Sequence, residues 1–579
     1  MNNMEARLAA ARGEIPCDLV ITNAKIVNVF NAEILPGTVG IHDGIIVGIG
    51  EYEGTERIDA GGAFMVPGFV EGHIHVESTM LTIPEFARTV LPHGTTTAVI
   101  DPHEIANVFG LEGIRYMLDS AENCPLDIFV MLPSCVPASP FESAGAELNA
   151  DDLATLIDHP RVAGIGEVMN YPAVCNGDPE FMRRIALAGR KTVDGHSPML
   201  RGALLNAYLT AGIQTDHECI KAEEALEKLR GGMHIHIREG STEHNLAELV
   251  RIVTPENARF ISLVSDDRHP DDLVEKGHLN YSVRLAIKHG IPPITAIRMV
   301  TINTARCYHL DHIGAIAPGY QADFFLTDTL QNCIPVRVFK RGITVAERGA
   351  CIVDTGSVPP LPGKSMRVAP VTGESFRIAV KGPLVRIIQV EEHQIVTRQV
   401  IEPVPQKDGF IHSDPQRDII KIAVVERHHA TGRIGTGLVR GLGLKKGAIG
   451  STVAHDAHNI IVTGLNDEDM AVAVQALIDS EGGLVVVCNG SVIASLALPI
   501  AGLMSDRKVE DVIERQQRLQ SAVRELGCSV SNPFMTLSFL ALTPIPELKI
   551  TDRGLFDAVQ FKPVELFLDS TNALHTITI

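Results

Sequence analysis

The chain has 579 residues, of which 45% are hydrophobic and 21% charged, a composition typical of a globular protein with several domains. Its formal net charge of −20 argues against a nucleic-acid partner, because neutralising phosphates requires a basic surface. We find no apolar run near the roughly 20 residues of a membrane span, no signal core and no Cys-x-x-Cys pair, so we expect a cytoplasmic protein without membrane contact.

Two β-rich segments flank a long alternating region. After a short helical lead-in, β-rich runs are punctuated by turn signals, and a similar pattern returns after residue 313. This predicts a small β-sandwich domain made of residues 1–65 and 313–357. Between them, in residues 66–312, strand-like and helical runs alternate, which predicts a (β/α)8 TIM barrel.

The remainder of the chain predicts a separate domain. Residues 358–373 are rich in Pro and Gly and indicate a linker. Residues 374–579 mix strand-like runs, such as RIAVKG at 377–382, with helical patterns such as DEDMAVAVQALID at 467–479. The predicted fold class is therefore α/β: a (β/α)8 TIM barrel, a small β-sandwich domain and a C-terminal α/β domain.

The stretch GHIHVEST places His73 and His75 two residues apart at the end of a strand-like run, so both imidazoles face the same side. Further His and acidic residues end later strand-like runs. At roughly 31 residues per βα unit, their spacing assigns the set to barrel strands 1, 4, 5, 6 and 8. The full set of expected ligands is His73, His75, Glu167, His196, His217 and Asp266.

These side chains predict a site for two divalent metal ions. We expect His73, His75 and Asp266 to hold one ion, His196 and His217 to hold the other, and Glu167 to bridge the two with a shared hydroxide. Mixed imidazole and carboxylate donors suit Zn²⁺, Mn²⁺ or Fe²⁺. Asp266, Glu167 and His217 are the expected catalytic residues, with proton transfer assigned to Asp266 or Glu167.

The metal pattern resembles the amidohydrolase superfamily, in which the bridge is often a carboxylated lysine; here its position is Glu167. The stretches GHIHVESTM, DPHEIANV, GEVMNYPAV, SDDRHPDDLVEKGH and STVAHDAHNIIVTG resemble the adenine deaminase family within it, from about residue 16 to the end. The resemblance implies hydrolysis of adenine to hypoxanthine and ammonia, with Mn²⁺ or Fe²⁺ as the typical ions. We also expect a homodimer or higher homo-oligomer.

Contacts to the purine are expected from polar residues that follow the strands. These candidates are Glu77, His103, Glu104, Arg238, Glu239, Ser241, Asp267, His455 and His458. One departure from the family is a second H-x-H, His234 and His236, which we interpret as strand residues. The HDAH turn at 455–458 has three interpretations: a metal site, a polar turn, or a loop that closes over the barrel mouth, of which we favour the last.

Three alternative functions follow from the same residues. Another amidohydrolase, such as a cyclic amidase or an imidazolone hydrolase, would share the metal ligands but not DPHEIANV or the C-terminal domain. A related 6-aminopurine is the alternative substrate. The zinc deaminases that combine H-x-E with P-C-x-x-C are excluded, because the chain contains no P-C-x-x-C. A non-catalytic binding barrel is disfavoured by the complete set of expected ligands.

Overall fold

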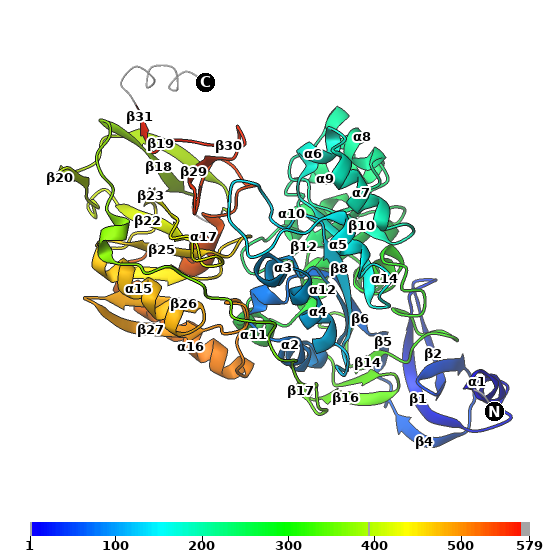
Figure 1. Cartoon of the computed structure of the whole chain (residues 1–579). Coiled ribbons are helices and arrows are strands. Elements are labelled where there is room, and N and C mark those ends of the chain that lie inside the picture. The colour runs from blue at the N-terminus through cyan, green and yellow to red at the C-terminus, as the bar shows by residue number, and fades with distance from the viewer. Residues whose placement is uncertain (1–2, 392–393, 569–579) are drawn as a thin grey trace. The chain divides into compact units, whose positions relative to one another are not determined.

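The computed structural model describes residues 3–391 and 394–568 of the chain, which divides into two compact units (Figure 1). The barrel unit comprises Met1–Pro102, Tyr116–Ser134 and Asn149–Pro359. The C-terminal unit comprises His103–Arg115, Cys135–Leu148 and Pro360–Ile579. Two segments from the stretch 66–312 therefore pack with the C-terminal unit. The domain boundaries expected from the sequence stay a prediction.

One mixed sheet joins the two β-rich segments of the barrel unit. Its strand order is β17-β16-β15-β14-β5-β1-β2-β3, with β4 paired to β1. The strands are β1 (Cys17–Asn28), β2 (Glu33–His42), β3 (Ile45–Ile49), β4 (Gly54–Asp59), β5 (Phe64–Pro67), β14 (Phe324–Thr327), β15 (Arg337–Lys340), β16 (Ile343–Glu347) and β17 (Ala350–Cys351), preceded by α1 (Asn3–Ala11). The antiparallel pair β5–β14 connects the two segments, and buried side chains such as Ile26, Phe324 and Phe339 form its core.

Eight parallel strands form the barrel that the alternating pattern predicts. They are β6 (Phe69–Ile74), β7 (Thr95–Ile100), β8 (Asp127–Pro133), β9 (Val162–Val168), β10 (Thr192–Gly195), β11 (Thr215–Asp216), β12 (His234–Arg238) and β13 (Ile261–Val264). Strands β6 to β10 pair in sequence order, as do β11 to β13. The last strand returns to the first, because the Asp266 N–H donates to the His73 carbonyl at 2.9 Å. The strands are almost wholly buried, as expected for a parallel sheet covered on its outer face.

Helices follow the barrel strands. They are α2 (Ile83–Val90), α4 (Leu111–Ser120), α5 (Ala150–Ala154), α6 (Tyr171–Cys175), α7 (Pro179–Leu187), α8 (Gly202–Thr210), α9 (Ala222–Arg230), α10 (Leu246–Leu249), α11 (Pro270–Glu275), α12 (Leu279–Lys288), α13 (Pro293–Met299) and α14 (Ile302–Cys307). Among the described residues, no helix combines the length and the apolar character that crossing a membrane requires.

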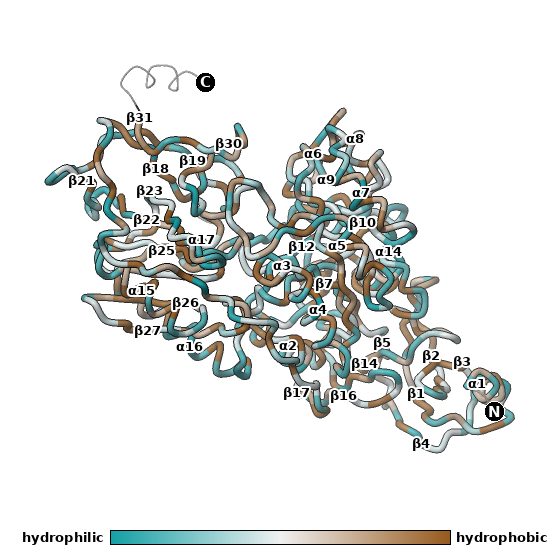
Figure 2. Tube along the Cα trace, in the orientation of Figure 1, coloured by the Kyte–Doolittle hydropathy of each residue, from teal (hydrophilic) through white to brown (hydrophobic). Residues whose placement is uncertain are grey.

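The C-terminal unit is built on a second sheet, in the order β19-β18-β23-β22-β25-β24-β26-β27, with β31 paired to β18. Its strands are β18 (Leu384–Val390), β19 (Thr397–Glu402), β22 (Ile419–Val425), β23 (Ile434–Arg440), β24 (Ala448–Ser451), β25 (Ile460–Gly464), β26 (Gly483–Cys488), β27 (Ser491–Ala497) and β31 (Phe567–Leu568). The central strands β22 and β25 are apolar along most of their length (Figure 2) and fully buried. The run RIAVKG, expected as a strand, contributes only one isolated bridge, between Ala379 and Phe410.

Helices cover this sheet because their apolar residues recur at helical spacing. On α15 (Asp467–Asp479), the apolar residues form one buried stripe that packs on β24, β25 and β26: Met470, Ala473, Val474 and Leu477. Figure 1 labels α15, β25 and β26. The side chain of Asn466 caps this helix by accepting from the Asp469 N–H at 2.7 Å. The unit's other helices are α3 (His103–Phe109), α16 (Val509–Glu525) and α17 (Pro533–Phe539).

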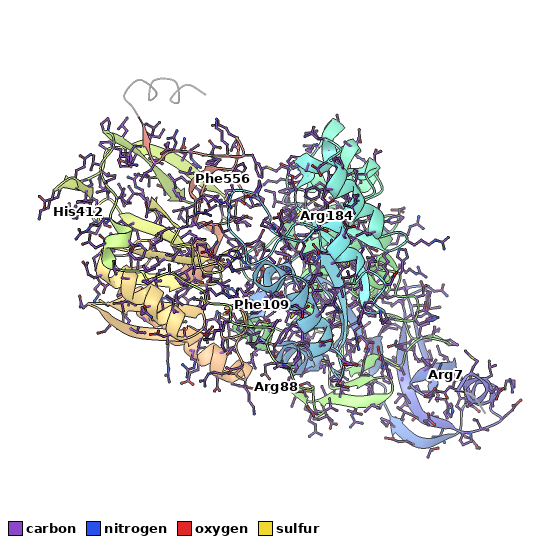
Figure 3. The ribbon with its side chains drawn as sticks, viewed as in Figure 1. Arg7, Arg88, Phe109, Arg184, His412 and Phe556 are labelled. Atoms are coloured by element: carbon purple, nitrogen blue, oxygen red, sulfur yellow. The ribbon has the colours of Figure 1, made fainter. Side chains whose placement is uncertain are left out.

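Small β elements complete the C-terminal unit. They are β20 (Gln406–Lys407), β21 (Phe410–Ile411), β28 (Leu548–Thr551), β29 (Gly554–Asp557) and β30 (Lys562–Pro563). The ring of Phe556 on β29, labelled in Figure 3, lies 5.4 Å from that of Phe141 and 5.3 Å from that of Phe561, measured between centroids. This aromatic group packs the segment 135–148 into the unit.

Candidate metal centre

Two imidazoles and two carboxylates meet at the end of the first barrel strand. Nε2 of His73 lies 3.4 Å from Oε1 of Glu167 and 3.6 Å from Oδ1 of Asp266. Nε2 of His75 lies 3.0 Å and 3.3 Å from the same two oxygens. All four residues are at least 96% buried, although they come from the ends of β6, β9 and β13. The fold therefore brings together residues that are nearly two hundred positions apart in the sequence.

The other oxygen of Glu167 faces a second pair of imidazoles. Nδ1 of His196 donates to Oε2 of Glu167 at 2.8 Å, and Nε2 of His217 lies 3.6 Å from the same atom. The ring of His217 stacks on that of His73 with centroids 3.9 Å apart. Glu167 thus lies between the H-x-H pair on one side and the His196–His217 pair on the other.

Asp101, which follows β7, orients two of these side chains. Its Oδ2 accepts from the backbone N–H of Glu167 at 2.7 Å, and its carbonyl accepts from Nδ1 of His75 at 2.9 Å. A proton on Nδ1 leaves the lone pair of His75 on Nε2, the atom that faces the carboxylates. Gly166 makes this approach possible, since a Cβ at that position would lie 2.5 Å from Oδ2 of Asp101.

These residues fit a pair of divalent cations. Four imidazoles and two carboxylates are donors that Zn²⁺, Mn²⁺ and Fe²⁺ accept. Metal–ligand bonds of about 2.1 Å place neighbouring ligand atoms roughly 3.0–3.4 Å apart, which is close to the separations measured here. Nε2 of His73, Nε2 of His196 and Nδ1 of His217 are buried and make no hydrogen bond in the described part of the chain.

The electrostatics keep the carboxylates ionised. Burial acts to raise the pKa of Glu167, but its interactions with the surrounding imidazoles of His217, His196 and the H-x-H pair outweigh it and hold the pKa well below its usual range. Burial also acts to raise the pKa of Asp266, and His73, His75 and Arg238 together hold it low. Conversely, burial and the charge of His73 depress the pKa of His217, which favours a neutral ring that can bind a cation.

Sequence reasoning did not single out Glu218, which the structure places beside the second imidazole pair. Its Oε1 lies 3.5 Å from Nε2 of His217 and 3.7 Å from Nδ1 of His196, and His196, His217 and Glu218 form a group able to hold a metal ion. The motif TDHE contained the signal, since Glu218 directly follows His217. Arg238 pairs with both oxygens of Glu218 and donates to Oδ2 of Asp266 at 2.8 Å.

The residues expected to contact the substrate differ in whether their side chains already have partners within their own loop. Glu77 is buried in a 3-10 turn (Glu77–Thr79) directly after the H-x-H pair. The hydroxyl of Ser78 donates to Asp267 at 2.5 Å. By contrast, Glu239 accepts from His244 and from the Leu246 N–H, so its carboxylate is engaged within its own loop.

Ser241 is likewise engaged, because its hydroxyl donates to Asp272 at 2.6 Å. The second H-x-H takes no part in the metal group just described: His234 contacts the Ser262 hydroxyl at 2.8 Å, and Nε2 of His236 lies 3.1 Å from the Tyr308 hydroxyl. Four remaining candidates fall in the C-terminal unit, where they lie near one another: His103, Glu104, His455 and His458.

Comparison with known proteins shows the family to which the chain belongs. Residues 64–347 match the amidohydrolase family, and residues 394–562 match the adenine deaminase C-terminal domain. An adenine deaminase of Desulfatibacillum aliphaticivorans is 48% identical over 97% of this chain and 99% of its own length, and adenine deaminase 2 of Carboxydothermus hydrogenoformans is 47% identical over 98% and 100%. A solved structure of beta-aspartyl dipeptidase from Fervidobacterium islandicum AW-1 aligns with a TM-score of 0.45 at 18% identity, covering 58% of this chain and 97% of that one.

Proposed function

The chain belongs to the adenine deaminase family of amidohydrolases, and we propose that it hydrolyses adenine to hypoxanthine and ammonia at the metal centre of its barrel. The observation that carries the proposal is the position of Glu167 between the H-x-H pair and the His196–His217 pair. A carboxylate with one oxygen toward each pair suits a bridge between two cations.

The proposed ligands are the six residues expected from the sequence, with Glu218 as a further candidate beside His196 and His217. Divalent ions held there would lower the pKa of a bound water and so supply the nucleophile for C6 of adenine. We propose Mn²⁺ or Fe²⁺ as the ions, with Zn²⁺ as the alternative. We further propose a cytoplasmic enzyme that assembles as a homo-oligomer.

The protein's own residues supply proton transfer. Attack of water on C6 forms a C–O bond, and departure of ammonia breaks the C–N bond. One proton of the attacking water must therefore reach the leaving amine and the other a ring nitrogen, which leaves the 6-oxo group of hypoxanthine. Asp266 is suited to this because its carboxylate is ionised, buried and fixed by Arg238 through Oδ2, which leaves Oδ1 toward the imidazoles. Glu167 is the alternative carrier.

Recognition of the purine is proposed for polar groups of the barrel unit near these ligands. Glu77 follows the H-x-H pair, and Asp267 follows Asp266; both are buried and can contact ring nitrogens. Arg238 is better suited to positioning than to substrate contact, because Glu218 and Asp266 occupy its donors. Glu239 and Ser241 are weaker candidates for the same reason.

The test is ammonia release from adenine by enzyme stripped of metal and reconstituted with Mn²⁺ or Fe²⁺, with metal content counted in the same samples. We expect turnover that depends on metal and falls by at least about 10²-fold in Glu167→Gln. A panel of hydantoins, dihydropyrimidines and other 6-aminopurines addresses the alternative substrates. Faster turnover of any of these than of adenine would overturn the assignment.

A further inference from the structure

A second group of side chains able to hold a metal ion lies in the C-terminal unit. Glu104 lies in the first turn of α3, and His455 and His458 lie in the loop between β24 and β25. One ligand atom from each of the three lies within 4.8 Å of the others. Nδ1 of His455 is 3.3 Å from Oε1 of Glu104, and Nε2 of His458 is 4.0 Å from Oε2 of the same carboxylate.

We propose that Glu104, His455 and His458 bind a third divalent transition-metal ion, of the Mn²⁺, Fe²⁺ or Zn²⁺ class, distinct from the pair in the barrel. The first argument is spacing. Within the barrel centre, imidazole nitrogens and carboxylate oxygens lie 3.0–3.6 Å apart. The His455–Glu104 contact of 3.3 Å falls within this range, and the His458–Glu104 contact of 4.0 Å is longer than its upper end. Both are longer than hydrogen bonds of about 2.9 Å.

Two further acidic and imidazole groups adjoin the three ligands. Oδ1 of Asp456 lies 3.7 Å from Nδ1 of His455 and 3.7 Å from Nε2 of His103. Asp456 therefore offers a fourth oxygen donor, and His103 can orient it. Imidazole and carboxylate together are the donor set that first-row divalent ions prefer, whereas a calcium site would be built from oxygen alone.

Burial supplies the second argument. Glu104 and His458 are fully buried, and His455 is 3% exposed. Nε2 of His458, the nitrogen of that ring that faces Glu104, makes no hydrogen bond in the described residues. Buried polar atoms are normally paired, because removing them from water without a partner is costly. A cation held by Glu104, His455 and His458 would give this buried nitrogen a partner.

The loop that carries the two histidines is held from several sides. Nε of Arg427 donates to the His458 carbonyl, and its other donors bind the carbonyls of Ser365 and Ala501. The His455 ring stacks on Phe539, with centroids 5.3 Å apart. Such support reduces the conformational entropy that a bound ion would otherwise have to offset.

Cation binding requires one local change. Nδ1 of His458 accepts from the Ala454 N–H at 3.2 Å, so the neutral ring carries its proton on Nε2. Coordination through Nε2 moves this proton away and gives up the Ala454 hydrogen bond. The exchange replaces one neutral hydrogen bond by a metal–nitrogen bond, and it predicts that occupation of this site shifts the His458 tautomer.

The experiment is a count of bound ions in the full chain. Metal-free protein is reconstituted with Mn²⁺, dialysed and analysed by elemental analysis and electron paramagnetic resonance. We expect three Mn²⁺ per chain in the unaltered protein and two in the double variant His455→Gln, His458→Gln. His412→Gln is the matched control, because His412 is an exposed histidine of the same unit (Figure 3), and it should retain three.

A reciprocal variant keeps the proposal testable if the double variant fails to fold. His73→Ala and His75→Ala combined with His196→Ala and His217→Ala remove the imidazoles of both barrel positions. This variant should retain one ion, with the six-line signal of an isolated Mn²⁺. Retention of that ion supports the third site whatever happens to activity. A maximum of two ions in the unaltered protein, loss of all Mn²⁺ in the barrel variant, or a third ion that survives the double histidine change would overturn the proposal.

Discussion

Replacing Arg238 by glutamine tests how the metal centre holds its acidic side chains in place. The guanidinium of Arg238 donates to Asp266 at 2.8 Å and pairs with both oxygens of Glu218, one of them at 3.1 Å. The three side chains are only 4–5% exposed. Removal of the arginine leaves two buried carboxylates without the cation that now compensates both.

The magnitude follows from this geometry. Breaking a buried ion pair by removing one partner costs about 3–5 kcal/mol, because the remaining charge is left uncompensated. We expect Arg238→Gln to lower the unfolding free energy of the metal-free protein by about that amount. The loss of unfolding free energy should be smaller in Arg238→Lys, because lysine keeps the positive charge although it lacks the planar guanidinium that binds both carboxylates. Adding Glu218→Gln to Arg238→Gln should recover part of the lost stability, because one of the two buried, uncompensated charges disappears.

Urea unfolding of metal-free protein, followed by far-ultraviolet circular dichroism, measures these differences. In parallel, kcat should fall in Arg238→Gln because Asp266 loses the contact that orients it, while the fall in Arg238→Lys should be smaller. An unfolding free energy within about 1 kcal/mol of the unaltered protein would refute the reasoning. So would a double variant no more stable than Arg238→Gln alone.

Three further predictions concern protons. Asp266→Asn should lower kcat by about 10²–10⁴-fold while metal content is retained, and full turnover would exclude its role in proton transfer. Burial acts to lower the pKa of His73, but Asp266 and Glu167 outweigh it and raise the pKa to about 10. Binding of Mn²⁺ at pH 8 should therefore release a proton to a weakly buffered solution, and the affinity for Mn²⁺ should decrease as the pH is lowered. Equal proton release from His73→Gln would contradict this. Burial lowers the pKa of Lys549 to about 7, below its unfolded value near 10.5, so the unfolded chain binds more protons between these pH values and stability should rise with pH there. Lys549→Met should flatten that rise in a series of urea midpoints, and an unchanged slope would count against the assignment.

Much of the barrel could be predicted from the sequence, because its organisation is periodic. Each βα unit brings the carboxyl end of one strand to the same mouth, so residues such as His73, Glu167 and Asp266 could be expected to converge from their spacing alone. The structure agrees: Nε2 of His73 lies 3.4 Å from Oε1 of Glu167 and 3.6 Å from Oδ1 of Asp266. The catalytic use of these residues stays a prediction.

Contacts between side chains whose positions do not follow the βα repeat could not be predicted from spacing. Glu218 and Arg238 belong to the centre only because β11, β12 and β13 adjoin, which turns three separate side chains into one ion-paired group. RIAVKG has the composition of a strand but contributes a single bridge, because strand formation depends on an available partner edge as well as on propensity.

The sequence by itself determined the barrel, the H-x-H motif and the register of the strand-end ligands, since local patterning and an approximately constant repeat specify them. Only the tertiary structure decided that α3 packs with the C-terminal unit and brings Glu104 to His455 and His458. The physical reason is that such a meeting depends on long-range packing of whole elements, which leaves no periodic trace in the residues that meet.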